Sequence, residues 1–126
     1  MLNLTLSSNC GNAPKQVFLK DFNVAFAEGN VDFIVDHVSE DIEWTVIGDS
    51  TIEGKTEFEA ALRRMAHVKA ESLTINGIIT HGKEAALHGE MTLNTGDTYI
   101  FCDIYEFVSA GKQIVRKMHS FVTKDE

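Results

Sequence analysis

The segment TYIFCDIYEFV, from Thr98 to Val108, constrains the fold more than any other, because it predicts a strand with two apolar faces. Alternation along an extended strand divides its side chains into two sets. One face carries Tyr99, Phe101, Asp103, Tyr105 and Phe107, and the other carries Ile100, Cys102, Ile104, Glu106 and Val108. A strand of this kind needs cover on both sides of its sheet. We therefore expect helices on one face and a second subunit on the other.

The composition predicts one domain over residues 1–126, with residues 1–12 as a leader strand or loose tail and residues 13–123 as the core. A net charge of -8 has the wrong sign for binding nucleic acid or an anionic membrane. Cys10 and Cys102 are far apart and suggest neither a redox pair nor a disulfide framework. A reducing, cytoplasmic location fits this cysteine usage best.

Two segments near the N-terminus have the periodicity of amphipathic helices. The first runs from Pro14 to Glu28, with Asn12 as its cap and Gly29 as its stop. The second follows Asn30 and carries apolar residues at helical spacing as far as Val38. Both helices should pack their apolar faces on a sheet.

The rest of the chain predicts a strand, a third helix and a four-stranded meander. DIEWTVIG alternates as a strand, and a loop from Gly48 to Gly54 follows it. A capping box of Thr56 and Glu59 then begins a helix that runs to about Val68. The meander comprises SLTINGIIT, EAALHGEMTL, TYIFCDIYEFV and QIVRKMHSFVT, separated by short turns. This order predicts an α+β fold with helices on one face of a mostly antiparallel sheet.

The order of elements resembles the nuclear transport factor 2-like superfamily, and within it the SnoaL-like and ketosteroid isomerase-like branch. The resemblance spans about Pro14 to Thr123 and rests on FNVAFAEGNVDFIVDHVSEDIEW, Gly54, CDIYEFVSAGKQI and the HSF of the last strand. It implies a cone, cystatin-like in architecture, of three helices against a strongly curved sheet. It implies less about activity, because this superfold hosts isomerases, hydrolases, cyclases, transport factors and binding proteins.

The functional residues of these relatives are only partly matched here. The general-base aspartate of ketosteroid isomerases falls at Val46 and their oxyanion-hole tyrosine at Phe22, whereas the protonated acid of that hole falls at Asp103. Limonene epoxide hydrolases need an Asp-Arg-Asp set. Their last-strand aspartate falls near His119, and no arginine stands two residues before Asp103. The resemblance therefore supports neither of these two reactions in its usual form.

The residues themselves suggest a pair formed by Asp103 and His119. Asp103 shares its strand face with aromatic residues only, where burial disfavours a charged carboxylate unless a donor compensates. Hairpin pairing about the SAGK turn brings Asp103 near Met118 or His119, and inward alternation selects His119. A histidine oriented by a carboxylate is a usable general base near neutral pH. The alternative is that the two residues satisfy each other in the core and do nothing else.

An apolar ligand pocket inside the cone is the second candidate feature. Its expected lining is Phe22, Trp44, Val46, Tyr99, Phe101, Tyr105 and Phe121. The alternative for these aromatic residues is a filled core. We expect no cofactor and no metal, because the sequence has no phosphate-cradling glycine loop and no histidine spacing such as HExxH.

Three functions stay open from the sequence. The first is a cofactor-independent isomerase, cyclase or hydrolase that acts on a small hydrophobic carbonyl or ring compound. The second is a protein that binds such a molecule without catalysis, and the third is a dimeric scaffold domain whose cone is closed by side chains. In each case we expect a homodimer that buries an outer apolar row of Ile100, Cys102, Ile104 and Met118.

Overall fold

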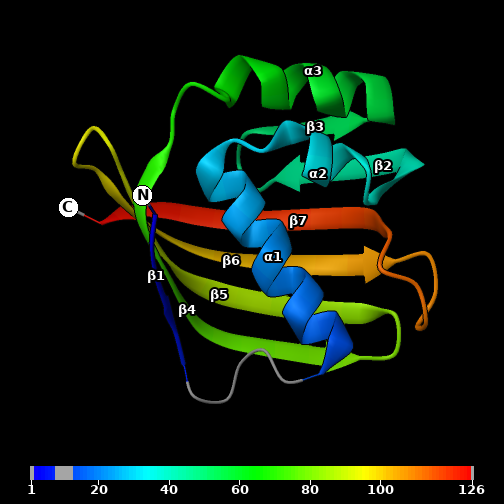
Figure 1. The fold of residues 1–126 in the computed structure, drawn as a ribbon. Helices are drawn as coiled ribbons and strands as arrows, with labels where there is room; N and C mark the ends of the chain where they lie inside the picture. The colour runs from blue at the N-terminus through cyan, green and yellow to red at the C-terminus, as the bar shows by residue number, and fades with distance from the viewer. Residues whose placement is uncertain (1, 8–12, 126) are drawn as a thin grey trace.

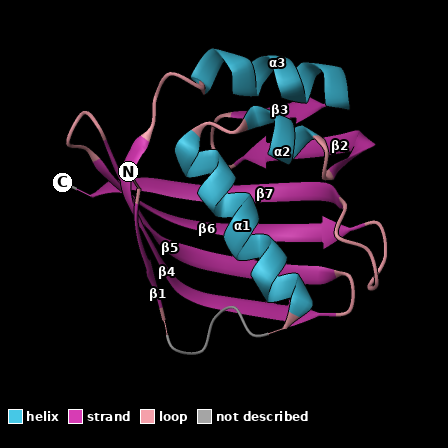
Figure 2. Ribbon diagram, in the orientation of Figure 1, coloured by secondary structure: helices cyan, strands magenta, loops and turns pink. Residues whose placement is uncertain are grey.

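Three helices lie against one face of a single curved sheet in the computed structural model, which describes residues 2–7 and 13–125 (Figure 1). The helices are α1 (Pro14–Glu28), α2 (Val31–Val35) and α3 (Lys55–Met65). The strands are β1 (Asn3–Leu6), β2 (Val38–Val46), β3 (Ser50–Glu53), β4 (Ala70–His81), β5 (Glu84–Leu93), β6 (Thr98–Phe107) and β7 (Val115–Asp125). This arrangement confirms the predicted α+β class with helices on one side of the sheet (Figure 2).

The sheet has the strand order β1-β4-β5-β6-β7-β2-β3. Strands β4 to β7 form the predicted antiparallel meander. Strand β2 joins it by parallel pairing with β7, and β1 pairs in parallel with β4 at the other end. Strand β3 was expected to be loop; it pairs antiparallel with β2. It escaped prediction because its four residues are mostly exposed and carry no extended apolar alternation.

The helices follow the sequence pattern except at their ends. Helix α1 has the predicted bounds, and Gly29 ends it in the left-handed conformation at φ 72°; its expected cap, Asn12, lies outside the described residues. Helix α2 ends at Val35, earlier than predicted, because Val38 already pairs with Val115 in the sheet. Helix α3 is also shorter than predicted.

The beginning of α3 corrects a second expectation. Gly54 occupies the cap position and contributes no side chain, while Thr56 lies inside the first turn instead of capping it. The helix ends at Met65, three residues before the expected end at Val68. Within the described residues, no helix is long and apolar enough to cross a membrane.

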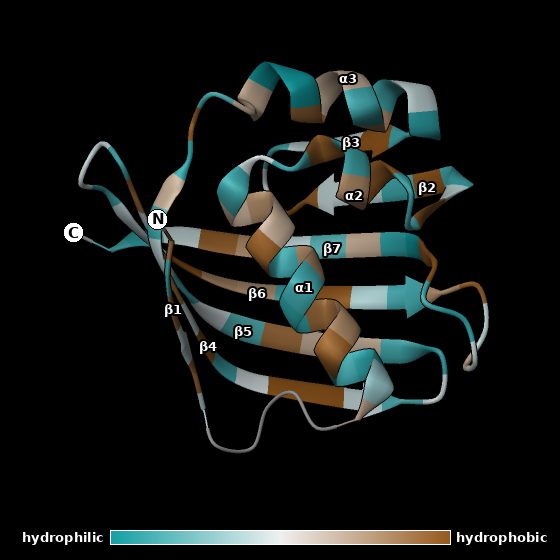
Figure 3. Cartoon of the chain, viewed as in Figure 1, coloured by the Kyte–Doolittle hydropathy of each residue, from teal (hydrophilic) through white to brown (hydrophobic). Residues whose placement is uncertain are grey.

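The core lies between the helices and the inner face of the sheet. Apolar and polar residues alternate along α1 and the strands that it crosses (Figure 3), as one-sided burial requires. Aromatic rings interlock in this layer: Phe18 stands edge-on to Phe107 at 5.8 Å between ring centroids, and Trp44 to Phe58 at 5.7 Å. Such edge-to-face contacts fix ring orientation in addition to burying area.

The outer face of the sheet carries large apolar side chains that the described part of the chain leaves partly exposed. Ile100, Ile104 and Phe121 are 42%, 42% and 43% exposed, and Cys102 beside them is half-buried. Met118 was expected in this outer row, which is wrong, because it pairs with Tyr105 and is buried in the core. A face of this kind is unusual for a monomer.

We expect a second copy of the chain to cover this outer face. In such a dimer, the substitution Ile104→Lys would place a charge in the covered interface and should make the protein monomeric. The same change at Val17, an exposed residue of α1, is the matched control and should leave the dimer intact. Light scattering at micromolar concentration measures both. A wild-type protein that is already monomeric would contradict the expectation.

Candidate functional site

A cavity of about 660 Å³ opens between the helices and the inner face of the sheet. Its walls come from elements far apart in the sequence, and most of the lining is apolar. The side chains that define it include Asn23 and Phe26 of α1, Leu62 and Met65 of α3, Trp44 and Val46 of β2, Tyr99, Phe101 and Asp103 of β6, and Met118 and Ser120 of β7. A cavity of this size and character is typical of small-molecule sites.

The structure brings part of the predicted site together. Trp44, Val46, Tyr99, Phe101 and Asp103 all line the cavity. Phe22 and Tyr105 are fully buried in the core and pack against each other at 6.1 Å between ring centroids. They are therefore structural neighbours of the cavity and not part of its described lining.

His119 and Phe121 lie on the opposite face of the sheet from Asp103. Asp103 is paired with Ser120, so the inward residues of β7 are Met118 and Ser120. The expected hydrogen bond between Asp103 and His119 is therefore wrong, as is the expected place of Phe121 inside the cone. A shift of one residue in register moves every side chain of a strand to the other face.

A bulge explains this error in register. Phe107 pairs with Val115 next to the turn, and uninterrupted counting from that pair would place Asp103 opposite His119. The pairing shifts by one residue between Glu106 and Phe107, so Glu106 is opposite Lys117. An irregularity of this kind inserts one unpaired residue and changes which side chains face inward.

Hydrogen bonds from two directions converge on the Asp103 carboxyl group. On one side, the Asn23 side-chain nitrogen donates to the Leu19 carbonyl at 2.9 Å and to the Tyr105 hydroxyl at 3.0 Å. Tyr105 in turn donates to Asp103 Oδ2 at 3.2 Å. These bonds connect α1 to the middle of β6.

The second set of hydrogen bonds reaches Asp103 from β2 and β7. The indole Nε1 of Trp44 donates to Ser120 Oγ at 2.9 Å, and Ser120 forms a side-chain hydrogen bond with Asp103. Trp44 and Ser120 are both buried, so solvent has little access to the hydrogen bond between them. Two hydroxyl groups thus hold one carboxyl group in place at the cavity wall.

Burial dominates the electrostatics of this carboxyl group. Loss of hydration raises the pKa of Asp103 from its ordinary value of 3.8 to about 6, and the hydrogen bonds from Ser120 and Tyr105 oppose that rise. The pKa of Tyr105 is raised well above its usual range, first by burial and then by the Asp103 charge. Tyr105 therefore stays protonated and keeps donating, while Asp103 can gain or lose a proton near neutral pH.

Asn23 and Ser120 were not anticipated as part of the site. Asn23 lies one helical turn after Leu19 and is buried, so a polar residue on the apolar face of α1 was the available signal. Ser120 could have been found only with the correct register of β7. Neither residue titrates, which is why a search for acid-base groups passes over both.

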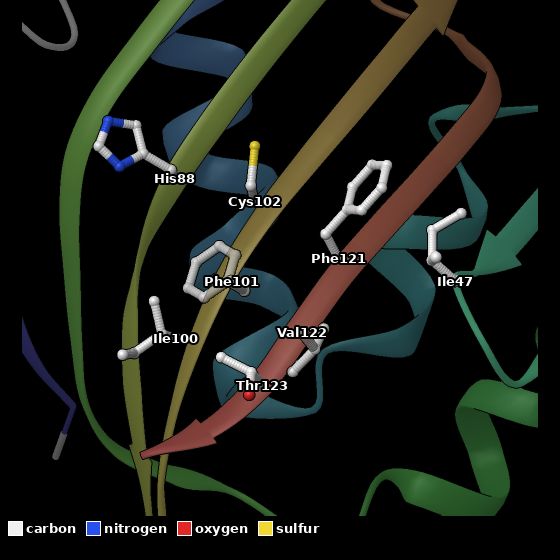
Figure 4. Close-up of a pocket in the computed structure, with 8 residues that line it drawn as sticks. All are labelled: Ile47, His88, Ile100, Phe101, Cys102, Phe121, Val122 and Thr123. Carbon is white, nitrogen blue, oxygen red and sulfur yellow. The ribbon is translucent and has the colours of Figure 1, made fainter.

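A second, more open hollow of about 520 Å³ lies on the outer face of the sheet (Figure 4). Phe121, Cys102 and His88 rise there from the neighbouring strands β7, β6 and β5. Burial raises the pKa of the Cys102 thiol, and the Asp103 charge adds to this effect, so the thiolate is disfavoured. Among the described residues, no group of three or more His, Cys, Asp and Glu side chains could hold a metal ion.

Comparisons with known proteins agree on the fold. The family model of the SnoaL-like domain matches residues 19–117. A nuclear transport factor 2-like protein of unknown function from Burkholderia xenovorans LB400 is 18% identical with a TM-score of 0.73, over 89% of this chain and 84% of that chain. No curated protein sequence matches.

Two other similar structures carry enzyme names. An LEH-like epoxide hydrolase from M. tuberculosis is 18% identical with a TM-score of 0.73, over 86% of this chain and 82% of that chain. A ketosteroid isomerase-like protein from Kribbella flavida DSM 17836 is 13% identical with a TM-score of 0.72, over 89% of this chain and 79% of that chain. At these identities the likeness shows the fold alone.

The raised pKa of Asp103 makes the stability of the protein depend on pH. The folded state holds this proton more tightly than the unfolded chain, so the stabilisation from protonation is complete below about pH 4 and is lost as the pH rises through about 6. Asp103→Asn cannot ionise and keeps an oxygen that can accept from Tyr105. We expect it to raise the free energy of unfolding at pH 7.5 by about 1 to 3 kcal/mol and to change it little at pH 4.

Urea denaturation at the two pH values measures this difference. Asp49→Asn is the matched control, because Asp49 is an exposed carboxyl at the cavity rim, and it should have no comparable effect. Destabilisation by Asp103→Asn at pH 7.5 would mean that the ionised carboxylate stabilises the fold and that the raised pKa is wrong.

Proposed function

The chain belongs to the family of SnoaL-like domains, and we propose that its cone binds a small apolar molecule on which Asp103 accepts and returns a proton. The observation that carries this proposal is a carboxyl group, with a pKa near 6, on the wall of a largely apolar cavity. Perturbed carboxyl groups in such cavities are the usual candidates for acid-base chemistry. Two similar structures with enzyme names are consistent with a small-molecule reaction on this fold.

The environment of Asp103 suits proton transfer in both directions. At neutral pH the carboxylate form predominates and can take a proton from a bound molecule. The protonated form differs from it little in free energy at this pH, so the proton can also be returned. Tyr105 and Ser120 hold the carboxyl group at a fixed position, which preserves its geometry in both states. Fixed geometry of this kind lowers the cost of reaching the transition state.

One such group is sufficient for an internal rearrangement. A C–H or O–H bond of the substrate breaks, its proton moves to an Asp103 oxygen, and the electron pair stays on the substrate. The same proton then returns to another atom of the substrate as the new bond order is established. An isomerisation or ring closure of a carbonyl or ring compound needs no oxidant, no reductant and no cofactor for this sequence.

Binding without turnover is the second candidate. It is favoured by the positions of the other carboxyl and the histidine among the described lining residues, because Asp49 and His67 are both exposed at the rim. His119, the base expected from the sequence, lies on the outer face. The cavity volume supports either of these candidates over a scaffold whose cone is filled by side chains.

Trp44 provides a direct signal for binding, because it is the only tryptophan of the chain and lines the cavity. We expect apolar ring compounds that enter the cone to change its fluorescence in a saturable way. Val17→Trp in a Trp44→Phe background moves the only tryptophan to the exposed face of α1 and should remove the response. An unchanged response in that variant would place binding elsewhere.

Turnover separates the two candidates. A panel of small apolar hydroxy, keto and epoxy ring compounds is incubated in D₂O, and deuterium uptake or conversion is followed by mass spectrometry. We expect the rate to rise with pH through a midpoint near 6, to fall at least about a hundredfold in Asp103→Asn and to persist in Asp49→Asn. Saturable binding with neither deuterium uptake nor conversion would favour the second candidate, and turnover that survives in Asp103→Asn would exclude Asp103 as the acid-base group.

A further inference from the structure

The hydrogen bonds around Asp103 have a direction that their chemistry fixes. The Leu19 carbonyl can only accept, so the Asn23 atom that contacts it is the amide nitrogen, and that nitrogen also donates to the Tyr105 hydroxyl. Tyr105 then has its own hydrogen free for Asp103. Every donor on this side of the carboxyl group is used within the protein.

The hydrogen bonds that reach Asp103 from β2 and β7 likewise have all their donors directed toward the carboxyl group. An indole nitrogen can only donate, so Trp44 requires Ser120 Oγ as its acceptor. The single hydrogen of the Ser120 hydroxyl is then directed to Asp103. Trp44, Ser120 and Asn23 are all buried residues that line the cavity. The indole, hydroxyl and amide hydrogens of these residues are all used within the protein, so none can be donated to a ligand.

Among the described side chains, therefore, only acceptors face the ligand at this end of the cavity. They are the remaining lone pairs of the Asp103 carboxylate, which lines the cavity. The other polar lining groups lie toward the rim: Asp49, Ser50, Arg64 and His67 are exposed. Tyr99 lies four residues before Asp103 on the same strand, which places it about 13 Å away along the chain.

From this polarity we infer that the ligand is an apolar molecule carrying a hydroxyl or amine that donates its hydrogen to Asp103. This inference rests on the proposed function and narrows its substrate class. A ligand that presents only a carbonyl or ether oxygen here would lose its hydration and gain no hydrogen bond. A carboxylate would in addition face the like charge of Asp103.

The inference also specifies which proton Asp103 takes. The ligand hydrogen that forms the hydrogen bond to the Asp103 carboxylate is also the one transferred to it. The bond broken is therefore O–H or N–H, and its electron pair stays on that oxygen or nitrogen. The resulting nucleophile can attack another atom of the same molecule, and the proton returns from Asp103 to the atom that loses its bond. Ring closure or ring opening fits this sequence better than removal of a proton from carbon, which needs a donor for the developing oxyanion.

Three probes that share a naphthalene ring and differ in one substituent test the ligand class. Equilibrium dialysis at pH 7.5, where Asp103 is mostly ionised, compares 2-naphthol with 2-methoxynaphthalene and 2-acetylnaphthalene. The first offers a donor, the second replaces that hydrogen with a methyl group, and the third offers a carbonyl. We expect 2-naphthol to bind at least about tenfold more tightly than either of the others, because a hydrogen bond to a charged group is gained.

Ser120→Ala reverses this preference in part. It removes the acceptor of the Trp44 indole, whose hydrogen then faces the cavity and can be donated to a carbonyl. Affinity for 2-acetylnaphthalene should rise at least about threefold over the wild type. Val46→Ala is the matched control, since it enlarges the same cavity without freeing a donor and should not improve binding of the ketone relative to the other probes.

Asp103→Asn gives an independent test if Ser120→Ala does not fold. Its amide presents a donor to the cavity, so the preference for 2-naphthol should disappear. Wild-type affinity for the ether or the ketone equal to that for 2-naphthol would overturn the inference and leave the proposed function standing. If none of the three probes binds, the inference and the proposed binding function both fail. A preference for 2-naphthol that persists in Asp103→Asn would mean that another group accepts its hydrogen and would also overturn the inference.

Discussion

Placing a carboxylate inside an apolar layer is the constraint on which the middle of this molecule depends. Asp103 loses hydration there, and an unpaired carboxylate would be too costly to keep. Tyr105 and Ser120 supply the compensating hydrogen bonds, and each is itself fixed by a donor from another element, Asn23 of α1 and Trp44 of β2. Helix α1, the neighbouring strands β6 and β7 and the returning strand β2 are thereby joined around one group. The position of that group defines the polar end of the cavity.

The hydrogen bonds to Asp103 offset its loss of hydration only in part, and this determines the acid-base behaviour of the group. Full compensation would keep the pKa of Asp103 at its ordinary value. Without any compensation, the carboxyl group would stay neutral at physiological pH. Burial outweighs the two hydrogen bonds and leaves the pKa at about 6. A carboxyl group in this range can exchange protons with a bound molecule. Its donors, once committed to Asp103, are not free to bind a ligand oxygen.

Local pattern and element order were sufficient to predict most of the fold. The Phe-rich periodicity from Pro14 and the alternation in TYIFCDIYEFV give the right elements, and their order gives the right family. The inward positions of Trp44, Phe101 and Asp103 were likewise predictable from alternation together with the family resemblance. Pairing between strands is different, because it depends on tertiary geometry that a propensity does not encode.

The bulge between Glu106 and Phe107 shows the consequence of that difference. It exchanges His119 for Ser120 opposite Asp103, and with this single step the site changes from an Asp-His pair to a lone carboxyl group held by hydroxyls. Nothing in SAGK or its flanking residues identifies the bulge in advance. Asn23 was missed for a related reason, since its role depends on the Tyr105 hydroxyl of a strand distant in sequence.

The titration of Asp103 itself tests the account most directly. With ¹³C-labelled aspartate, the side-chain carboxyl resonance of Asp103, assigned by its loss in Asp103→Asn, can be followed by NMR against pH. We predict a midpoint near 6, well above the ordinary aspartate value of 3.8. A midpoint at or below the ordinary value of 3.8 would show that the hydrogen bonds from Tyr105 and Ser120 outweigh burial, and would contradict the account of this site.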